Sequence, residues 1–146
     1  MTIRLMCEKD IAAVEALEKR TFSMPWSRSD FERCVQEAHY RFFVAADEEE
    51  RILGYAGYLY DFDEADITNV AVDEACRRKG IARHLLQTLL SDGQEQGVRT
   101  FFLEVRDSNL PAVCLYESFG FQRVGTRKDY YREPREDARV YSLQYE

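Results

Sequence analysis

Gly80 stands among basic residues at the point where a strand-like run passes into a helix-like run, and this combination suits an anion. The apolar stripe from Ile81 to Leu90 predicts a helix that begins near Gly80. The first N–H groups of a helix lack partners within it and lie at the positive end of its dipole. Gly80 and the small Ala82 let phosphates approach that backbone. Positive charge comes from the neighbouring residues Arg77, Arg78, Lys79 and Arg83.

The chemistry expected at this turn is the binding of a pyrophosphate. An ordinary basic helix start with a glycine turn is the alternative. The segment matches neither the Walker A loop nor the G-x-G-x-x-G fingerprint.

The elements that would position this turn can be followed along the chain. Apolar spacing and capping patterns predict helices that begin after Asp10, at Ser27, near Gly80 and at Asn109. Runs rich in β-formers predict strands over residues 2–6 and in the segments that begin at Arg41, Ile52, Asp66, Thr100, Phe121 and Ala138. The predicted order is βααβββαβαββ.

The long helix near Gly80 lies between two strands, and this unit decides the fold class. A strand, helix, strand crossover makes its two strands parallel, whereas the earlier strands, separated by acidic turns, form an antiparallel meander. We therefore expect an α/β fold of one domain over residues 1–146, with a mixed, mostly antiparallel sheet, a parallel central pair and flanking helices. The parallel strands, which end at Val72 and near Glu104, can splay and expose backbone groups to a ligand.

Charge and composition narrow the classes of partner. The net charge of −7 opposes binding to a phosphate backbone, so nucleic acid is not expected. No run approaches the roughly 20 apolar residues of a membrane span, and the N-terminus lacks the apolar core of a secretory signal, so a cytoplasmic protein is expected. Four separated cysteines and two histidines predict neither disulfides nor a metal site. The oligomeric state has no signal in the sequence.

Three longer strings give the chain a family resemblance. NVAV followed by RRKGIA, then LEVRDSNLPAVCLYESFGF from Leu103, together with the element order, resemble the GNAT superfamily of N-acetyltransferases over almost the whole chain. Within it, MPWS from Met24, LEVRDSN and DYY from Asp129 are most similar to the RimI-type enzymes. That resemblance implies acetylation of the N-terminal alanine of a small-subunit ribosomal protein.

The resemblance implies acetyl-CoA as cosubstrate, without a metal, and assigns roles by position. The pantetheine arm would pair with the strand at Val70, Ala71 and Val72. The pyrophosphate would lie on the backbone amides of Arg77, Arg78, Lys79, Gly80, Ile81 and Ala82. Asn109 would contact the cofactor arm near its reacting end. Glu104 would be the general base, and Tyr116, which borders the cofactor, the general acid. Independently of the resemblance, aromatic rims with polar tips suit peptide recognition. We therefore expect an acceptor slot lined by Trp26, Tyr130 and Tyr131, with core packing the alternative for Trp26.

These roles agree with the chemistry of amine acetylation. An α-amine has a pKa of about 7.7–8.0, so it must lose a proton before it can attack, and Glu104 is placed to take that proton, through a water. A backbone N–H of Ala71 or Val72 would stabilise the developing oxyanion, and the Tyr116 phenol would protonate the departing thiolate. Taken singly, Glu104 fits an ion-paired surface group and Tyr116 a core residue, and only their occurrence beside the phosphate turn favours catalysis.

Three functions remain open at this point. The first is acetylation of a protein N-terminus. The second is a GNAT acetyltransferase for a small-molecule amine or an internal lysine, because this scaffold changes its acceptor pocket readily. The third is a non-catalytic CoA-binding module.

Overall fold

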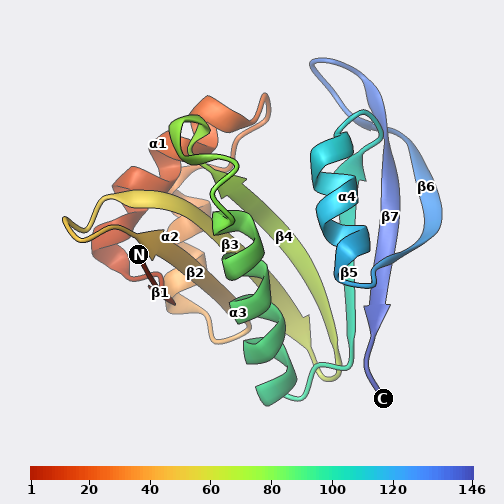
Figure 1. The fold of residues 1–146 in the computed structure, drawn as a ribbon, viewed down its shortest axis with the longest axis horizontal. Coiled ribbons are helices and arrows are strands. Elements are labelled where there is room, and N and C mark those ends of the chain that lie inside the picture. Colours follow the sequence, from red (N-terminus) through yellow and green to blue (C-terminus); the bar gives the residue numbers. More distant parts are fainter.

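The computed structural model describes all 146 residues and consists of one sheet with helices on both faces (Figure 1). The strands are β1 (Thr2–Leu5), β2 (Tyr40–Ala46), β3 (Ile52–Asp61), β4 (Glu64–Val72), β5 (Thr100–Arg106), β6 (Gln122–Tyr131) and β7 (Glu136–Gln144). The helices are α1 (Ile11–Thr21), α2 (Arg28–Gln36), α3 (Ile81–Glu95) and α4 (Leu110–Ser118), with short 3-10 turns at Glu8–Asp10 and Glu74–Cys76. The predicted order βααβββαβαββ is confirmed.

The sheet has seven strands in the order β1-β2-β3-β4-β5-β7-β6. Every neighbouring pair is antiparallel except β4 and β5, which are parallel. Their pairing is short, and it ends at Asp66 opposite Phe102. Beyond that point β4 keeps its bonds to β3 up to Val72, and β5 keeps its bonds to β7 up to Arg106. The expected parallel pair therefore exists, and its strands separate as predicted (Figure 1).

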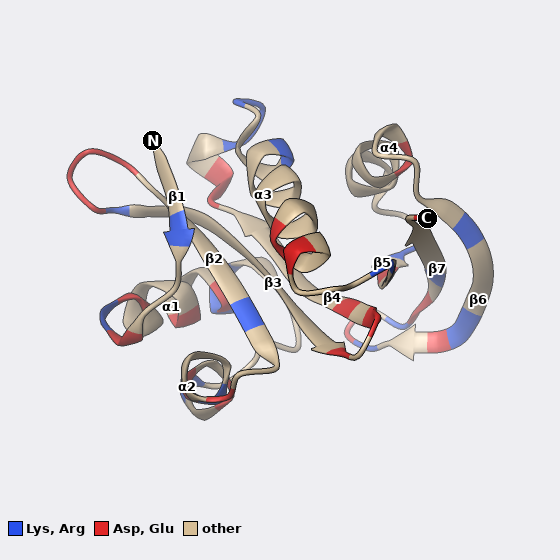
Figure 2. Ribbon diagram, turned by 90° about the horizontal axis from the view of Figure 1, so that it is seen from below, with Lys and Arg blue, Asp and Glu red and all other residues tan.

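Two apolar cores, one on each face, hold the helices to the sheet. On one face α3 and α4 cover a cluster that includes Leu85 and Leu89 of α3 and Leu103 of β5. On the other face α1 and α2 cover a smaller cluster around Ile11 and Phe31. Figure 2 shows these helix pairs on opposite sides of the sheet. Burial of each large aliphatic side chain contributes about 1.5–3 kcal/mol, so both helix layers are fixed by packing.

Local capping sets where two of these helices begin. The Ser27 Oγ accepts from the Asp30 N–H at 3.3 Å, and the Ser27 N–H donates to Asp30 Oδ2 at 2.8 Å. This confirms the predicted capping box at the start of α2. At the start of α4 the Asn109 side chain accepts from the Ala112 N–H at 3.3 Å.

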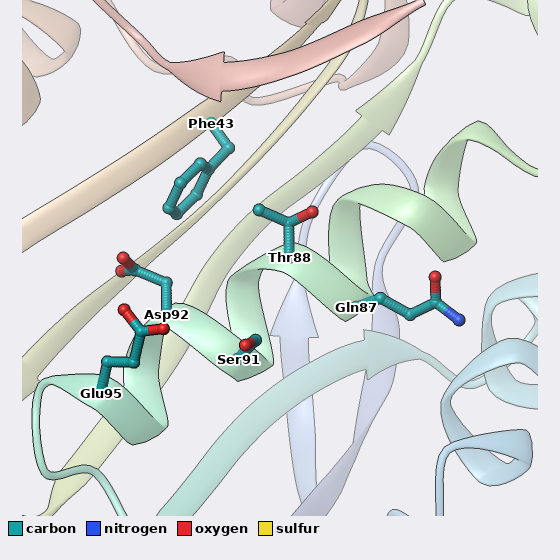
Figure 3. Close-up of a pocket in the computed structure, with 6 residues that line it drawn as sticks. All are labelled: Phe43, Gln87, Thr88, Ser91, Asp92 and Glu95. Atoms are coloured by element: carbon teal, nitrogen blue, oxygen red, sulfur yellow. The ribbon is translucent and has the colours of Figure 1, made fainter.

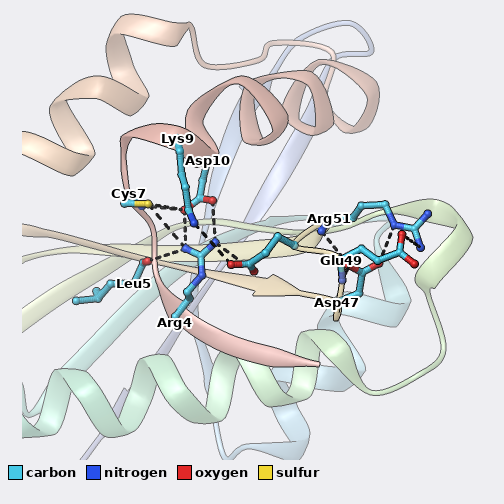
Figure 4. A network of polar contacts seen from close by, with 9 residues as sticks. Arg4, Leu5, Cys7, Lys9, Asp10, Asp47, Glu49 and Arg51 are labelled. Carbon is cyan, nitrogen blue, oxygen red and sulfur yellow. Dashed lines mark hydrogen bonds and ion pairs between the residues drawn. The ribbon is translucent and has the colours of Figure 1, made fainter.

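A polar cluster fixes the start of α1 against β1 (Figure 4). The Arg4 guanidinium donates to both oxygens of Asp10, at 2.7 and 2.9 Å, and the Cys7 N–H donates to Asp10 at 2.9 Å. Burial alone would raise the pKa of Asp10, but the bonds from Arg4 and Cys7 outweigh it and the pKa is lowered. Asp10 therefore stays ionised and anchors the start of α1. The same helix carries Glu18, which is bonded to Asn69 of the central strand β4.

A β-bulge in β4 changes which face its side chains occupy. Gly57 pairs with Asn69 and Tyr58 with Ile67, so Thr68 is left without a partner on β3. Ile67 packs in the α3 core, whereas Asn69 and the next alternate residue, Ala71, point to the α1 side. The bulge lies where β4 leaves β5, and so it orients the free part of β4.

Acidic residues gather at the turn between β3 and β4, where Asp61, Asp63 and Glu64 are exposed (Figure 2). These residues form a solvated rim of the β3–β4 hairpin. None of the helices is both long and apolar enough to cross a membrane.

Candidate active site

The turn before α3 presents a row of unpaired backbone donors. The first N–H of this region that is hydrogen-bonded is that of His84, which donates to the Gly80 carbonyl at 3.0 Å. The consecutive N–H groups from Arg78 to Arg83 have no acceptor in the protein. They lie at the positive end of a 15-residue helix. This arrangement can bind an anion with several backbone donors at once.

The backbone shape of the turn explains why these donors are open. Arg78 has φ 67° and Gly80 has φ 79°, so left-handed residues are interleaved in the turn, a pattern that forms anion-binding concavities. A Cβ placed on Gly80 would meet no atom within 4 Å. The side of Gly80 that lacks a side chain therefore faces open space, where a phosphate can approach.

The basic side chains near this turn have different surroundings. Arg78 and Lys79 are exposed, and they form the basic segment next to α3 in Figure 2. Arg77 is also exposed, but its Nε donates to the Val72 carbonyl at 3.2 Å, which ties the turn to the end of β4. Arg83 donates to Ser118 Oγ at 3.0 Å and so links α3 to α4. Arg78 and Lys79 are thus free to turn toward a phosphate, whereas Arg77 and Arg83 are held by neutral acceptors and keep their positive charge.

Ile81 and Ala82 contribute to the turn through the backbone. The Ile81 side chain is buried in the α3 core, and Ala82 packs against the same core. Their N–H groups have no acceptor in the protein and remain available to a ligand. The Asn109 side-chain oxygen accepts the capping hydrogen bond of α4, so only its amide nitrogen is free to bind a ligand.

The free edge of β4 leads away from the turn into the sheet. Val70, Ala71 and Val72 pair with β3 on one side and have no partner on the side of β5. An unpaired strand edge can take up an extended ligand by strand-like hydrogen bonds. The three residues named from the sequence thus lie together on an open edge that ends at the phosphate turn.

Tyr116 lies on the α3 and α4 side of the sheet. It is only 8% exposed, its ring packs edge-on against Phe121 at 5.9 Å, and its hydroxyl makes no hydrogen bond. The Tyr116 hydroxyl is not fully buried, because Asn69 Oδ1 is the one fully buried side-chain polar atom that lacks a hydrogen-bond partner. Burial and the nearby Tyr131 raise the pKa of Tyr116. A neutral phenol with a free hydroxyl can donate a proton.

Glu104 lies on the opposite face. Along β5 the buried residues Phe101, Leu103 and Val105 face α3, and Glu104 falls on the alternate side. Its carboxylate is 3.2 Å from the Arg127 Nε, and its side chain is 27% exposed. Glu104 is therefore ion-paired, as the structural alternative held, yet it stays accessible. The two candidate catalytic groups flank the separated strands from opposite faces.

Tyr130 and Tyr131 lie beside Glu104, whereas Trp26 packs against the core under α2. The two tyrosine rings are 5.0 Å apart, and Glu104 helps to raise the pKa of Tyr131 to about 12, after the larger effect of burial. The Trp26 ring packs on Phe31 at 5.7 Å and on Phe42 at 6.0 Å. This contact corresponds to the core-packing alternative for Trp26.

Sequence reasoning missed a buried polar cluster on the α1 side of β4. Glu18 of α1 is 2% exposed and accepts hydrogen bonds from Tyr55, from Asn69 Nδ2 at 3.2 Å and from the Trp26 N–H at 2.9 Å. A signal existed, because Glu18 follows Ile11 and Val14 on the apolar stripe of α1. A carboxylate at such a position needs buried donors.

A depression on the surface of α3 is separate from these residues (Figure 3). It is lined by Phe43 and by five side chains of α3 between Gln87 and Glu95. One of these, Asp92, is already bonded to Arg41 at 2.6 Å and to Tyr58 at 2.6 Å. The depression therefore borders a structural ion pair and lies far along α3 from the phosphate turn.

Comparison with known proteins decides the family. Residues 11–121 match the acetyltransferase (GNAT) family. The chain belongs to the GNAT acetyltransferases. The GNAT fold and the N-acetyltransferase class predicted from the sequence are thereby confirmed.

Individual GNAT relatives extend the match to both ends of the chain. The [ribosomal protein bS18]-alanine N-acetyltransferase of Salmonella typhimurium is 35% identical over 97% of this chain and 96% of its own. The crystal structure of the ribosomal-protein-S18-alanine N-acetyltransferase from Escherichia coli superposes with a TM-score of 0.89 at 35% identity, covering 98% of this chain and 92% of that one. Arabidopsis thaliana NAA60 in complex with acetyl-CoA has the same fold, with a TM-score of 0.89 at 19% identity, covering 98% of this chain and 97% of its own.

Proposed function

We propose that this GNAT enzyme transfers the acetyl group of acetyl-CoA to the N-terminal amine of a protein, with the N-terminal alanine of ribosomal protein bS18 as the preferred acceptor. The observation that carries the proposal is the 35% identity to bS18-alanine N-acetyltransferases over 97% of the chain. A ribosomal acceptor also accounts for the expected cytoplasmic location.

The donor side of the site suits acetyl-CoA, which supplies an acetyl group activated as a thioester. The unpaired N–H groups from Arg78 to Arg83 fit its pyrophosphate, because the open side of Gly80 leaves room for phosphate oxygens. The edge of β4 at Val70 to Val72 suits its extended arm. We assign cofactor binding to Arg77, Arg78, Lys79, Gly80, Ile81, Ala82, Val70, Ala71, Val72, Asn109 and Tyr116.

The acceptor side supplies the base. Glu104 lies on the face away from α3, so an amine that approaches from that face meets its carboxylate. The ammonium must lose a proton before attack, and Glu104 would take it directly or through a water. Arg127 now holds this carboxylate at 3.2 Å, and an incoming ammonium would compete with it.

The donor face supplies the acid and the oxyanion donor. Tyr116 keeps its proton because burial raises its pKa, and its hydroxyl is unbonded. It would therefore protonate the departing sulfur. The Val72 N–H, on the free edge of β4, would stabilise negative charge on the acetyl oxygen. The Ala71 N–H does not face this edge, because the Asp73 N–H donates to Leu53 of β3 and N–H groups alternate along a strand.

The aromatic groups beside Glu104 support a peptide acceptor. Tyr130 is 47% exposed and packs with Tyr131, so the pair offers an apolar wall with polar tips next to the base. Trp26 would take part only through the portion of its ring that its packing leaves exposed.

A peptide panel tests the proposal. The purified protein is incubated with acetyl-CoA and an alanine-initiated peptide of the bS18 N-terminus, with the same peptide blocked at its α-amine but containing lysine, and with a polyamine. Fragment-ion mass spectrometry should place the acetyl group on the α-nitrogen of the first peptide only. Acetylation of the blocked peptide or of the polyamine in preference would contradict the proposal, and binding of CoA without turnover would indicate a non-catalytic module.

A further inference from the structure

The loss of pairing between β4 and β5 leaves the acceptor face divided into two walls. One wall is β4 with α1, and the other is β5 with β7 and β6. The α1–α2 loop, residues 22–27, belongs to the first wall, and the β6–β7 turn, residues 132–135, belongs to the second. Both lie at the end of the molecule where the strands have separated (Figure 1). Something must fix their spacing if a peptide is to bind between them.

Arg106, the last residue of β5, holds the β6–β7 turn. Its Nη1 donates to the Pro134 carbonyl at 2.9 Å and lies 3.2 Å from the Glu136 carboxylate. Its Nη2 donates to the Arg132 carbonyl at 3.0 Å. The guanidinium also lies 4.4 Å from the centre of the Tyr131 ring. One side chain thus organises the turn and one of the aromatic groups beside Glu104.

The same Arg106 reaches across to the other wall. Its Nη2 is 3.4 Å from Ser23 Oγ, in the α1–α2 loop. Ser23 Oγ in turn donates to the Arg132 carbonyl at 3.2 Å. These contacts join segments that are 83 and 109 residues apart in the sequence. They bridge the walls at the end where the sheet itself no longer does.

The far end of the α1–α2 loop is fixed independently. The Trp26 N–H donates to Glu18 at 2.9 Å, and Glu18 is bonded in turn to Asn69 of β4. The loop is therefore anchored on Arg106 near its start, at Ser23, and through Glu18 on β4 near its end, at Trp26. Between the anchors it exposes Met24, at 48%, and Tyr130 on the opposite wall is 47% exposed. Exposed apolar side chains on both walls suit contact with a peptide.

We propose that Arg106 is a positioning residue that sets the spacing of the two acceptor walls by linking the α1–α2 loop to the β6–β7 turn. Arg106 acts through the loops and does not touch the reacting atoms. The inference rests on the proposed function, because it assumes a peptide between these walls. Arginine suits this role because its planar fork can serve several carbonyl and carboxylate acceptors together, which a lysine cannot do.

The chain offers a matched control for the test. Arg139 of β7 is 22% exposed and Arg106 is 24% exposed, and each forms an ion pair, Arg139 with Asp107 at 2.7 Å. Arg139 makes no side-chain bond to the α1–α2 loop or to the β6–β7 turn. Replacing either arginine by alanine removes an arginine of similar exposure and breaks its ion pair, whose carboxylate is 19% exposed for Glu136 and 51% exposed for Asp107. Only Arg106→Ala separates the walls.

The first readout compares the KM for the peptide with the KM for acetyl-CoA. For Arg106→Ala we expect the KM for the alanine-initiated peptide to rise roughly 10-fold or more, because the acceptor is no longer held at the required position. The KM for acetyl-CoA should stay near that of the wild type, since the phosphate turn is not touched. Arg106→Lys should show the same change in a milder form, and Arg139→Ala should leave the peptide KM unchanged. Equal peptide KM values in all four proteins would overturn the proposal.

The second readout needs no substrate and separates this proposal from the proposed function. Amide hydrogen exchange of residues 22–27 and 132–136 should become faster in Arg106→Ala and Arg106→Lys, but not in Arg139→Ala. Unchanged exchange would refute the link between the walls even if the peptide is acetylated. Conversely, faster exchange in an enzyme that acetylates only small amines would refute the proposed function and keep the link. If Arg106→Ala does not fold, both measurements are made on Arg106→Lys, which keeps the positive charge and the aliphatic part of the side chain.

Discussion

Replacing Gly80 by alanine tests the phosphate turn with a single methyl group. Gly80 has φ 79°, and a Cβ there would meet no protein atom within 4 Å. Gly97, just after the other end of α3, has φ 94° and is equally free of neighbours. The two substitutions therefore impose the same kind of backbone strain on the same helix, and only Gly80 borders the unpaired N–H groups.

The expected cost to folding is small and similar for both variants. An L-residue in the left-handed region destabilises the folded state by about 1–2 kcal/mol. Replacing glycine by alanine also restricts the unfolded chain, which stabilises the folded state by about 0.4–1 kcal/mol. We thus expect each variant to lose about 1 kcal/mol of unfolding free energy, a fall in Tm of about 4 °C. Neither variant meets a steric clash that would add to this.

The expected effect on cofactor binding differs between the variants. A methyl group at Gly80 would project toward phosphates bound as we propose, and would weaken one hydrogen bond or more to the N–H row. Hydrogen bonds to charged groups contribute about 1.5–3 kcal/mol each, so the Kd for acetyl-CoA should rise at least about 10-fold. Gly97→Ala should bind acetyl-CoA as the wild type does.

Titration calorimetry with acetyl-CoA, combined with thermal unfolding of the same samples, measures both effects. A rise in Kd confined to Gly80→Ala, with matched changes in Tm, supports the turn as the pyrophosphate site. An unchanged Kd for Gly80→Ala, or equal losses in both variants, would refute the reasoning.

Three further predictions follow from the groups on the two faces. Tyr116→Phe should lower kcat roughly 100-fold with little change in Tm, because its hydroxyl makes no protein hydrogen bond; an unchanged kcat in steady-state assays would remove Tyr116 as the acid. Glu104→Gln should lower kcat/KM by about 100-fold or more, whereas Asp107→Asn, which breaks the comparable ion pair to Arg139, should not; equal losses would indicate a structural role for both. Urea unfolding should show stability falling as pH rises above about 10, by up to about 1.4 kcal/mol per pH unit for each buried phenol, because phenols lose protons first in the unfolded chain. The phenols whose pKa is raised by burial are those of Tyr55, Tyr58, Tyr116 and Tyr131. Stability that is flat up to about pH 12 would contradict these raised pKa values.

Features encoded by neighbouring residues could be predicted from the sequence. The capping box of Ser27 and Asp30 involves residues three apart, and the cap at Asn109 is equally local. The parallel pair followed from the crossover through α3, whose handedness and packing leave few alternatives. The prediction therefore extended from these local signals to the separation of β4 and β5.

Features that depend on tertiary pairing could not be predicted. The bulge at Thr68 exists only in the register of β4 against β3, and no residue type marks it. The bond between Asn69 and Glu18 and the pairing of Glu104 with Arg127 join distant segments. Strand β6 was expected to begin at Phe121, but the pattern did not indicate that it continues as far as Tyr131. Nearly all its side chains are exposed, so the apolar alternation that marks a strand is missing.

A crystal structure with a covalent coenzyme A–peptide conjugate is the most direct measurement of where donor and acceptor meet. The pyrophosphate should accept hydrogen bonds from the N–H groups between Arg78 and Arg83, and the linking sulfur should lie between β4 and β5. The sulfur should face Tyr116, and the peptide should run on the Glu104 face between the α1–α2 loop and the β6–β7 turn. A conjugate with its phosphates elsewhere, or with the peptide on the α3 face, would contradict this arrangement.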